Sequence, residues 1–202
     1  MASPKNSHSP IETELQLWQK YKYVAGVDEA GRGCLAGPVF AGAVILPPFS
    51  SLPLKDSKSL TPSERKRLFL LIKKEAVAWG YGYAEVEEIE ELGILQASLL
   101  AMKRAILNLP ITPEIVIVDG NKTIPDLSIP QIAVVKADKY CKTVSGASIV
   151  AKVLRDDLME KIDEEYPLYG FKRHKGYPTK EHKKNILTYG PCEIHRKNFK
   201  LL

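Results

Sequence analysis

Cysteine is scarce in this sequence, which has only three among 202 residues, at positions 34, 141 and 192. A small, odd and widely spaced set excludes a disulfide-stapled secreted domain and favours reduced thiols in a cytoplasmic setting. Long apolar runs are lacking too, and no stretch approaches the ~20 residues that a membrane span needs. The polar N-terminus has no signal-peptide pattern. We therefore expect a cytoplasmic protein that makes no contact with membranes.

Zinc ligands at recognisable spacing are also lacking. Cys192 and His195 form one isolated C-x-x-H pair, whereas a structural zinc site needs four ligands. No serine, cysteine or threonine stands in a pattern typical of an activated nucleophile. The sequence therefore gives no support to zinc chemistry or to covalent catalysis through a side chain.

Basic charge is present but unevenly distributed. The formal net charge is +5, and the segment from Lys172 to the end has nine Lys and Arg against two acids, a local charge of +7. The remainder therefore carries about −2. A solvated basic tail would explain the charge equally well, but aromatic residues lie among the cations (Tyr169, Phe171, Tyr177 and Phe199). This combination favours a nucleic-acid partner.

Apolar periodicity predicts alternating strands and helices in the order β-β-β-α-β-α-β-α. Strands are expected over 24–28, 39–46, 81–86, 115–118 and 132–135, and helices over 11–21, 61–79, 94–108, 145–165 and 179–187. Residues 1–10 are polar and predicted to be disordered. The pattern indicates an α/β protein with a mixed sheet and helices on both of its faces.

Acidic residues end three of the predicted strands. Asp28 and Glu29 end the first, Asp119 ends the fourth, and Asp138 follows the fifth. Because ligand sites lie at the carboxyl ends of strands in open α/β sheets, we expect these acids to meet at one edge. A cluster of carboxylates without histidine or thiol selects hard cations such as Mg²⁺ or Mn²⁺. Adjacent strand residues point to opposite faces, so Glu29 requires a break in the strand or contributes its backbone carbonyl.

A glycine-flanked arginine, Gly31-Arg32-Gly33, follows the first pair of acids. Glycine lets backbone N–H groups approach a ligand closely, so this segment suggests a phosphate or sugar beside the metal. Gly31-x-Gly33-x-x-Ala36 also fits the dinucleotide fingerprint, but that motif must open a helix, and residues 38–44 are strand-like. The two preceding acids would moreover repel a pyrophosphate, so we reject this alternative.

Several sequence blocks together resemble ribonuclease HII over about residues 24–199. They are Gly26-Val27-Asp28-Glu29-Ala30-Gly31-Arg32-Gly33 with Gly37-Pro38-Val39, Asp56-Ser57-Lys58-Ser59-Leu60, Val118-Asp119-Gly120-Asn121, Lys136-Ala137-Asp138, Ser145 to Lys152 with Arg155-Asp156, Lys175-Gly176-Tyr177-Pro178-Thr179 with His182, and Gly190-Pro191 with Ile194-His195-Arg196. Departures are small: Gly146 stands where the family usually has alanine, and Cys192 and Asn198 where serine is common. The sister family, ribonuclease HIII, has a different first block and an extra N-terminal domain.

The resemblance implies an RNase H-like fold: a five-stranded mixed sheet flanked by helices, with a helical C-terminal extension. It implies an N-terminal tail and short helix over 1–22, a catalytic domain over 23–165 and a basic extension over 166–202 packed on the same domain. The expected activity is endonucleolytic cleavage of RNA in RNA–DNA hybrids, including cleavage 5′ of single ribonucleotides in duplex DNA. Two Mg²⁺ or Mn²⁺ ions would serve as cofactors, without a small-molecule cofactor, and we expect a monomer.

By position, the resemblance makes Asp28, Glu29, Asp119 and Asp138 the catalytic and metal-binding acids. Gly31, Arg32 and Gly33 would sense the 2′-hydroxyl at the RNA–DNA junction, which distinguishes the two backbones. Tyr177 would pack on the deoxyribose that follows. The candidates for further phosphate contacts are Lys58, Ser145, Ser148 and Lys152, for which loop-charge, helix-cap or helix-surface roles are equally acceptable.

Asp156 lies four residues after Lys152, a spacing that predicts an ion pair rather than a catalytic role. Two functional alternatives to the ribonuclease stay open at this point. One is another nuclease or integrase on the same fold, and the other is an RNA-binding module with a structural magnesium ion. The number of acids beside a ligand-approach loop disfavours the binding module.

Overall fold

A computed structural model describes residues 10–54 and 57–202. Disorder was predicted for residues 1–10, of which 1–9 lie outside the described part, as does the acid at position 56, whereas residue 10 begins a helix. Five strands form one sheet in the order β3-β2-β1-β4-β5. Their bounds are β1 Val24–Ala30, β2 Val39–Ile45, β3 Ala78–Ala84, β4 Ile115–Asp119 and β5 Gln131–Val134. β1 pairs antiparallel with β2 and parallel with β4, so the predicted five-stranded mixed sheet is confirmed.

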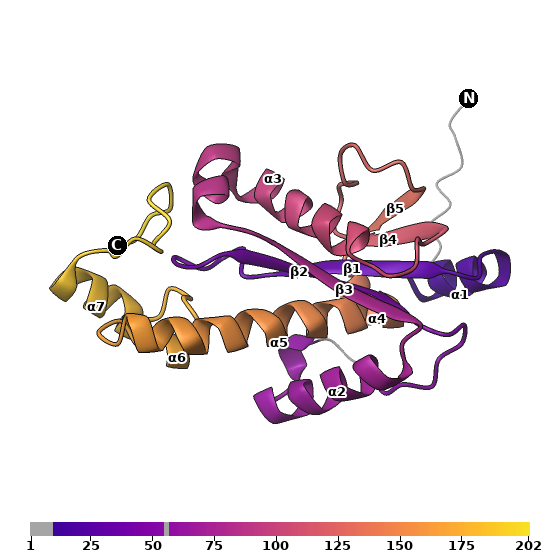
Figure 1. Ribbon diagram of the computed structural model, residues 1–202, viewed down its shortest axis with the longest axis horizontal. Coiled ribbons are helices and arrows are strands. Elements are labelled where there is room, and N and C mark those ends of the chain that lie inside the picture. The colour runs from indigo at the N-terminus through magenta and orange to yellow at the C-terminus, as the bar shows by residue number, and fades with distance from the viewer. Residues whose placement is uncertain (1–9, 55–56) are drawn as a thin grey trace.

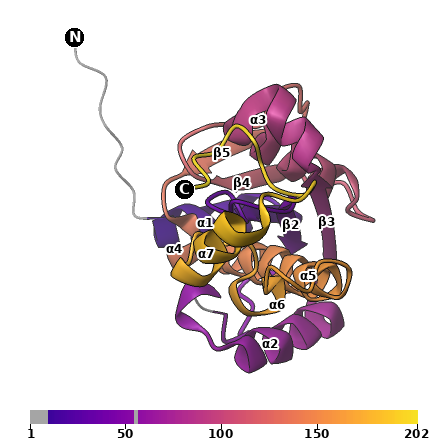
Figure 2. The ribbon, with the colours of Figure 1, turned by 90° about the vertical axis from the view of Figure 1, so that its left-hand side faces the viewer.

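Helices cover both faces of this sheet (Figures 1 and 2). The described helices are α1 Pro10–Lys20, α2 Pro62–Glu75, α3 Val86–Leu107, α4 Ala137–Tyr140, α5 Lys142–Glu165, α6 Phe171–His174 and α7 Lys180–Tyr189, with a short 3₁₀ turn, η1, at Ser57–Ser59. α3 buries one apolar cluster against the sheet, while α1, α2 and α5 bury a second cluster on the other face. Two cores therefore fix the sheet from both sides.

The predicted order β-β-β-α-β-α-β-α was wrong at two points. It has no helix between the second and third strands, where α2 lies, and it has one between β4 and β5, two parallel strands that a loop joins. Gln131 organises this loop: its side-chain amide bonds both the N–H and the carbonyl of Ile124, at 2.7 and 3.0 Å. The glutamine thus supplies the hydrogen bonds that secondary structure would otherwise provide.

The helix predicted over 61–79 ends earlier, at Glu75, and residues 78–84 form β3. The predicted start is correct, with a capping box between Thr61 and Glu64. Trp79 has helical spacing from the preceding apolar residues but belongs to the strand, where its ring meets Phe69 of α2 edge-on at 5.4 Å. Apolar spacing alone could not distinguish one more turn of this helix from a strand that packs on it.

α3 begins at Val86, eight residues before the predicted helix. Gly93 interrupts it with φ 76° and ψ 154°, a backbone conformation outside the helical region. The helical phase therefore changes at Gly93, and the predicted helix contains only the part after it. The other predicted helices differ from their predicted bounds by a few residues at most, whereas the short helices α4 and α6 were not predicted.

Small residues bring α5 close to the central strands. A Cβ on Gly26 would lie 2.4 Å from the Thr143 backbone, and a Cβ on Gly42 would lie 2.2 Å from the Ala147 carbonyl oxygen. The first turn of α5 is held by Glu14 of α1, which is 3% exposed and accepts from the N–H groups of Lys142 and Thr143. A carboxylate at a helix N-terminus satisfies unpaired N–H groups. α5 therefore packs directly against β1 and β2, and α1 fixes its first turn.

The C-terminal segment returns to the loop between β1 and β2. His195 forms an isolated antiparallel bridge with Ala36, and the Gly37 N–H donates to the Ile194 carbonyl at 2.9 Å. Tyr169 and Phe171 join Ala36 and Met159 in a third apolar cluster. The residues after α5 are therefore packed on the β1–β2 loop.

Candidate active site

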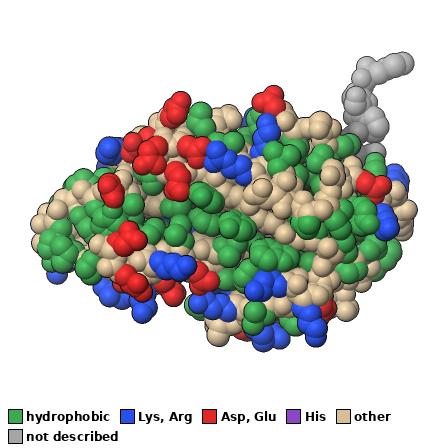
Figure 3. Space-filling view, in the orientation of Figure 1, with side chains coloured by type: hydrophobic (Ala, Val, Ile, Leu, Met, Phe, Trp, Pro, Cys, Tyr) green, Lys and Arg blue, Asp and Glu red, His purple; other side chains and the backbone are tan. Residues whose placement is uncertain are grey.

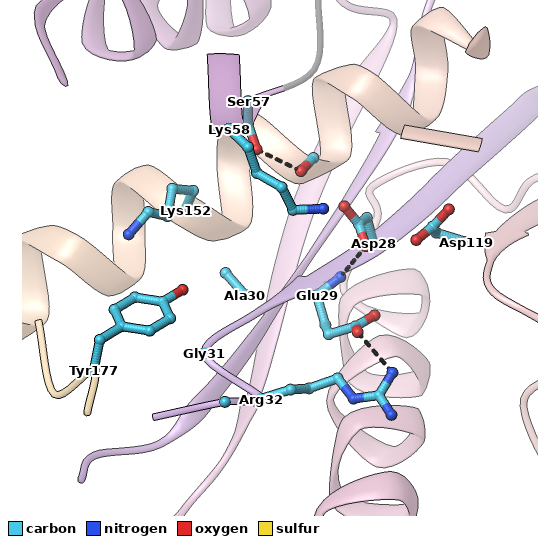
Figure 4. Close-up of a pocket in the computed structure, with 12 residues that line it drawn as sticks. Asp28, Glu29, Ala30, Gly31, Arg32, Ser57, Lys58, Asp119, Lys152 and Tyr177 are labelled. Carbon is cyan, nitrogen blue, oxygen red and sulfur yellow. Dashed lines mark hydrogen bonds and ion pairs between the residues drawn. The ribbon is translucent and has the colours of Figure 1, made fainter. Parts of the chain in front are cut away.

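The end of β1 opens into a cavity of about 240 Å³. Three of the four predicted acids line it, namely Asp28, Glu29 and Asp119. β1 continues unbroken through Ala30, so of the two alternatives for Glu29, a break in the strand or a contribution from its backbone carbonyl, the break does not occur. Figure 4 shows Asp28 pointing toward Asp119 and Glu29 pointing toward Arg32, as the alternation of a strand requires.

The fourth acid, Asp138, lies beside the cavity rather than in its lining. It belongs to α4, which follows β5, and is 2% exposed. Its backbone N–H donates to Asp119 Oδ1 at 3.4 Å, so the ends of β4 and α4 are in contact. The preceding Lys136 has φ 62°, and this left-handed residue turns the chain from β5 into α4.

Burial raises the pKa of the Asp28 carboxyl well above its ordinary value, and the charges of Glu29 and Asp119 raise it further. Hydrogen bonds from Ser148 and the Glu29 N–H oppose this shift in pKa. The pKa of Asp119 is also raised, first by burial and then by the charge of Asp138. The carboxylates therefore act on one another and destabilise each other's charged forms.

Two cations of the chain neutralise part of this cluster. Lys58, on η1, places Nζ 2.9 Å from Asp138 Oδ2, and Arg32 places NH1 3.1 Å from Glu29 Oε1. The side chains of Lys58 and Arg32 are 75% and 49% exposed, whereas those of their acids are 3% and 12% exposed. The exposed partner is thus the cation in both pairs, and the buried partner is the acid.

Within residues 10–54 and 57–202, no three Asp, Glu, His or Cys side chains converge closely enough to form a complete metal site. The donor set nevertheless fits a hard divalent cation, since it consists of carboxylate oxygens facing one cavity. Asp28 is 4% exposed and its charge is opposed by two neighbouring acids, a cost that a cation removes. Small side-chain movements would be needed to bring the oxygens onto one ion.

The Gly31-Arg32-Gly33 segment lines the same cavity. Gly31 has φ +97°, and a Cβ there would lie 2.1 Å from Nε of Arg155. Glycine is therefore required at position 31 by a buried arginine of this chain and by the backbone angle. A Cβ at Gly33 would meet nothing within 4 Å, so Gly33 is the glycine whose backbone is open to a ligand.

Tyr177 and Lys152 lie across the cavity from the acids (Figure 4). The Lys152 Nζ stands 5.2 Å from the centre of the Tyr177 ring and 2.6 Å from Asp156 Oδ1, which confirms the predicted ion pair. Burial lowers the pKa of Lys152, and Asp156 opposes that shift. Tyr177 is 36% exposed, so part of its side chain is accessible to a partner.

Three serines near the cavity have different environments. The hydroxyls of Ser57 and Ser148 are hydrogen-bonded at 2.8 Å, and both residues line the cavity. Ser145 lies outside the lining, where its hydroxyl donates to the Asp138 carbonyl at 2.6 Å. Sequence reasoning assigned no function to Ser57, although it belongs to the Asp56–Leu60 block that supports the resemblance.

Acidic and basic side chains alternate toward the lower edge of the face in Figure 3, where α2, α5 and α6 lie. Several of these charges are paired across elements, as Lys66 with Asp157 at 2.9 Å and Lys175 with Glu160 at 2.7 Å. Arg173 is likewise paired with Glu181. Glu181 is already counted in the local charge of +7, so Glu160 of α5 is the acid that further neutralises the basic C-terminal segment.

A sequence model of the family described as Ribonuclease HII matches residues 25–202. The chain belongs to the ribonuclease HII family. The ribonuclease HII of Nitrosococcus oceani is 54% identical over 178 residues, which cover 88% of each chain. That of Caldicellulosiruptor saccharolyticus is 50% identical over 187 residues, covering 92% of this chain and 91% of the relative. The resemblance based on sequence motifs is thereby confirmed, and the chain is a ribonuclease H, an endonuclease for the RNA of RNA–DNA hybrids.

Solved structures agree with this assignment. The ribonuclease H2 from Pyrococcus horikoshii OT3 has a TM-score of 0.73 at 29% identity, over 89% of this chain and 94% of that chain. Bst-RNase HIII in complex with Mn²⁺ has a TM-score of 0.72 at 17% identity, over 99% of this chain and 74% of that chain, a likeness of fold alone. The predicted RNase H-like fold is thus confirmed. In addition, no helix among the described residues is long and apolar enough to cross a membrane.

Proposed function

We propose that this ribonuclease HII also cleaves duplex DNA that contains a single ribonucleotide, on the 5′ side of that ribonucleotide. The observation that carries the proposal is one cavity lined by acids on one wall and by Gly31-Arg32-Gly33 and Tyr177 on the others. Acids suit the hydrolysis of a phosphodiester, while an open backbone and an aromatic face suit a sugar. Chemistry and sugar recognition therefore lie within one cavity.

Asp28, Glu29, Asp119 and Asp138 would hold two Mg²⁺ or Mn²⁺ ions in the working complex. Bound there, the ions would supply an activated water and charge stabilisation for in-line hydrolysis, which gives 3′-hydroxyl and 5′-phosphate ends. Support comes from the oxygen-only donor set and from the charge repulsion that raises the pKa of Asp28 and Asp119. Lys58 and Arg32 would move onto the phosphate backbone of a substrate, a role supported by their exposure and by their ion pairs with the acids.

The Gly33 backbone, the Arg32 side chain and the Tyr177 ring would read the junction between ribose and deoxyribose. Gly33 has open space where a Cβ would stand, so a 2′-hydroxyl can reach its peptide. Tyr177 would then pack on the deoxyribose that follows, and Lys152 beside its ring and Ser148 beside Asp28 would contact phosphates. We also propose that the protein works as a cytoplasmic monomer without a small-molecule cofactor.

The decisive experiment is a cleavage assay with Mg²⁺ and with Mn²⁺ on duplex DNA carrying one ribonucleotide. An all-DNA duplex of the same sequence is the control, and mapping of the product ends shows which phosphodiester is cut. Cleavage 5′ of the ribonucleotide with a 3′-hydroxyl end is expected. Cutting of the all-DNA duplex would instead favour a general nuclease on this fold, and binding without any product would favour an RNA-binding module.

A further inference from the structure

Two arginines, Arg155 and Arg196, are completely buried next to the cavity but do not line it. Among the described residues, no carboxylate lies within salt-bridge distance of either guanidinium. Buried cations are normally paired with an acid, since leaving water is costly for a lone charge. Burial accordingly lowers the pKa of Arg196 to about 10. The free-energy cost of burying these two guanidinium groups must therefore be offset by the hydrogen bonds that their N–H groups donate.

Arg196 donates hydrogen bonds to backbone carbonyls of the segment that follows β1. Its Nε and NH2 donate to the Gly37 carbonyl at 2.9 and 2.8 Å, and NH1 donates to the Arg32 carbonyl at 3.0 Å. The Arg196 N–H also donates to the Leu35 carbonyl at 2.8 Å. One residue, 164 positions away in the sequence, therefore fixes both ends of the segment from Arg32 to Gly37.

Arg155 connects the same segment to the turn that carries Tyr177. Its Nε and NH2 donate to the carbonyls of Pro38 and Ala36 at 2.9 and 3.0 Å, and NH1 donates to the Lys175 carbonyl at 2.8 Å. The guanidinium fills the space beside Gly31 and lies 6.0 Å from the centre of the Tyr177 ring. The Leu35 N–H adds a direct bond to the Gly176 carbonyl at 2.8 Å.

We propose that Arg155 and Arg196 are positioning residues for ribonucleotide recognition. They hold the segment from Gly31 to Pro38, which contains all the carbonyls that accept from the two guanidinium groups except that of Lys175, in a fixed position relative to the turn from Lys175 to Tyr177. Neither arginine touches substrate. Their forked N–H groups set the distance between the Gly33 backbone and the Tyr177 ring, the two features that face a ribose–deoxyribose junction. The proposal rests on the proposed junction reading, and it assigns the geometry of that reading to two residues outside the cavity.

Lysine variants separate positioning from simple stability, because lysine keeps the charge and length but cannot donate to three carbonyls in a planar fork. Arg155→Lys and Arg196→Lys are compared with Arg104→Lys, whose guanidinium also donates to a backbone carbonyl, that of Tyr83, and pairs with Glu88. For each variant, kcat and KM are measured on a duplex with one ribonucleotide and on a long RNA–DNA hybrid. Thermal melting and amide hydrogen exchange are recorded on the same samples.

The two lysine variants are expected to fold and to lose roughly tenfold to a hundredfold in kcat on the single-ribonucleotide duplex, because misplacement by about 1 Å costs that much. On the long hybrid, where many ribonucleotides offer alternative registers, the loss should stay within about threefold, and hydrogen exchange should rise in residues 31–38 and 175–177. The Arg104→Lys variant should match the wild type on both substrates.

Equal losses on the two substrates, unchanged kcat, or unfolding of both lysine variants would overturn the proposal, since the arginines would then be ordinary structural residues. Failure of the underlying function looks different. In that case the unmodified protein itself would leave the single-ribonucleotide duplex uncut while still cleaving the long hybrid.

Discussion

Asp119 is the acid whose replacement tests the catalytic proposal most directly, because it lines the cavity and is electrostatically linked to Asp138 and Glu29. We predict that Asp119→Asn keeps the fold and nucleic-acid binding but lowers the cleavage rate roughly a thousandfold, as expected when several kcal/mol of charge stabilisation are lost. Without metal, the variant should melt at a higher temperature than the wild type, because one of the mutually repelling charges is gone.

Single-turnover cleavage, a binding assay and thermal melting measure these three effects. Asp126→Asn, at an exposed position after β4, is the matched control and should leave all three unchanged. Near-normal turnover of Asp119→Asn would refute the assignment of this acid.

Arg32 has an exposed guanidinium, and its backbone carbonyl accepts a hydrogen bond from the buried Arg196. We predict that Arg32→Ala weakens the preference for a single-ribonucleotide duplex over a long hybrid more than it weakens overall binding. The physical reason is that the backbone stays in place while the contact nearest the junction is lost. The ratio of kcat/KM on the two substrates measures the preference, with the exposed Arg67→Ala as control. The same proportional loss on every duplex would contradict this prediction.

At the scale of elements, Gly93 separates α3 into two parts by a conformation that only glycine adopts without strain. A Cβ there meets nothing within 4 Å, so the cost of Gly93→Ala is conformational, and we predict a loss of roughly 1–3 kcal/mol in unfolding free energy. Gly146→Ala within α5 is the contrasting control. Its Cβ would make ordinary contacts from 3.4 Å, and helix propensity predicts a gain of up to about 1 kcal/mol. Urea denaturation of both variants compares the two effects, and an unchanged Gly93→Ala would show that α3 accommodates the kink without glycine.

The histidines of the C-terminal extension form an ordered hydrogen-bond chain. The Cys192 N–H donates to His195 Nδ1 at 3.0 Å, which leaves the proton on His195 Nε2, 3.1 Å from His182 Nε2. His182 Nδ1 then donates to the Tyr177 carbonyl at 2.9 Å. A second proton on His182 would occupy Nε2 and face the Nε2–H group of His195, so that two donors would meet without an acceptor. Burial is the largest cause that lowers the pKa of His182, to about 4.

This arrangement predicts a pH-dependent stability. Unfolded His182 takes up a proton near pH 6.5, whereas the folded residue does so only near pH 4. The unfolding free energy that neutral His182 contributes is therefore complete above about pH 6.5 and is lost as the pH falls toward 4, by roughly 3–4 kcal/mol at most. Urea denaturation at pH 7, 5.5 and 4.5 measures the slope, and His182→Gln should flatten it. The same slope in that variant would assign the effect to other groups.

At the scale of the whole molecule, metal binding should be visible as stability, because a ligand of the native state alone favours folding. We predict that Mg²⁺ or Mn²⁺ at about a hundred times its Kd raises Tm by roughly 5–10 °C, which corresponds to about 2.7 kcal/mol. EDTA should reverse the rise, and Asp119→Asn should show little of it. A metal-independent Tm in the wild type would argue against binding of ions by these carboxylates.

Elements with a strong local pattern could be predicted from the sequence alone. The apolar runs that end in Asp28 and Asp119 do form neighbouring parallel strands, as a shared sheet edge requires. Prediction failed where two structures share one pattern, as at Trp79, or where a single glycine changes the phase of a helix, as at Gly93. Local apolar spacing carries no information about which element a segment packs against, and that packing decides between such alternatives.

The sequence by itself determined the family, the five strands and the acids at their ends, because these depend on short-range patterns and on contiguous motifs. Only the tertiary structure decided that Lys58 pairs with Asp138, that Glu14 caps α5 and that Arg155 and Arg196 hold the segment after β1. Each of these contacts joins residues between 80 and 164 positions apart. Sequence periodicity cannot predict contacts over such separations, because these residues meet only when the sheet has formed and α5 has packed against it.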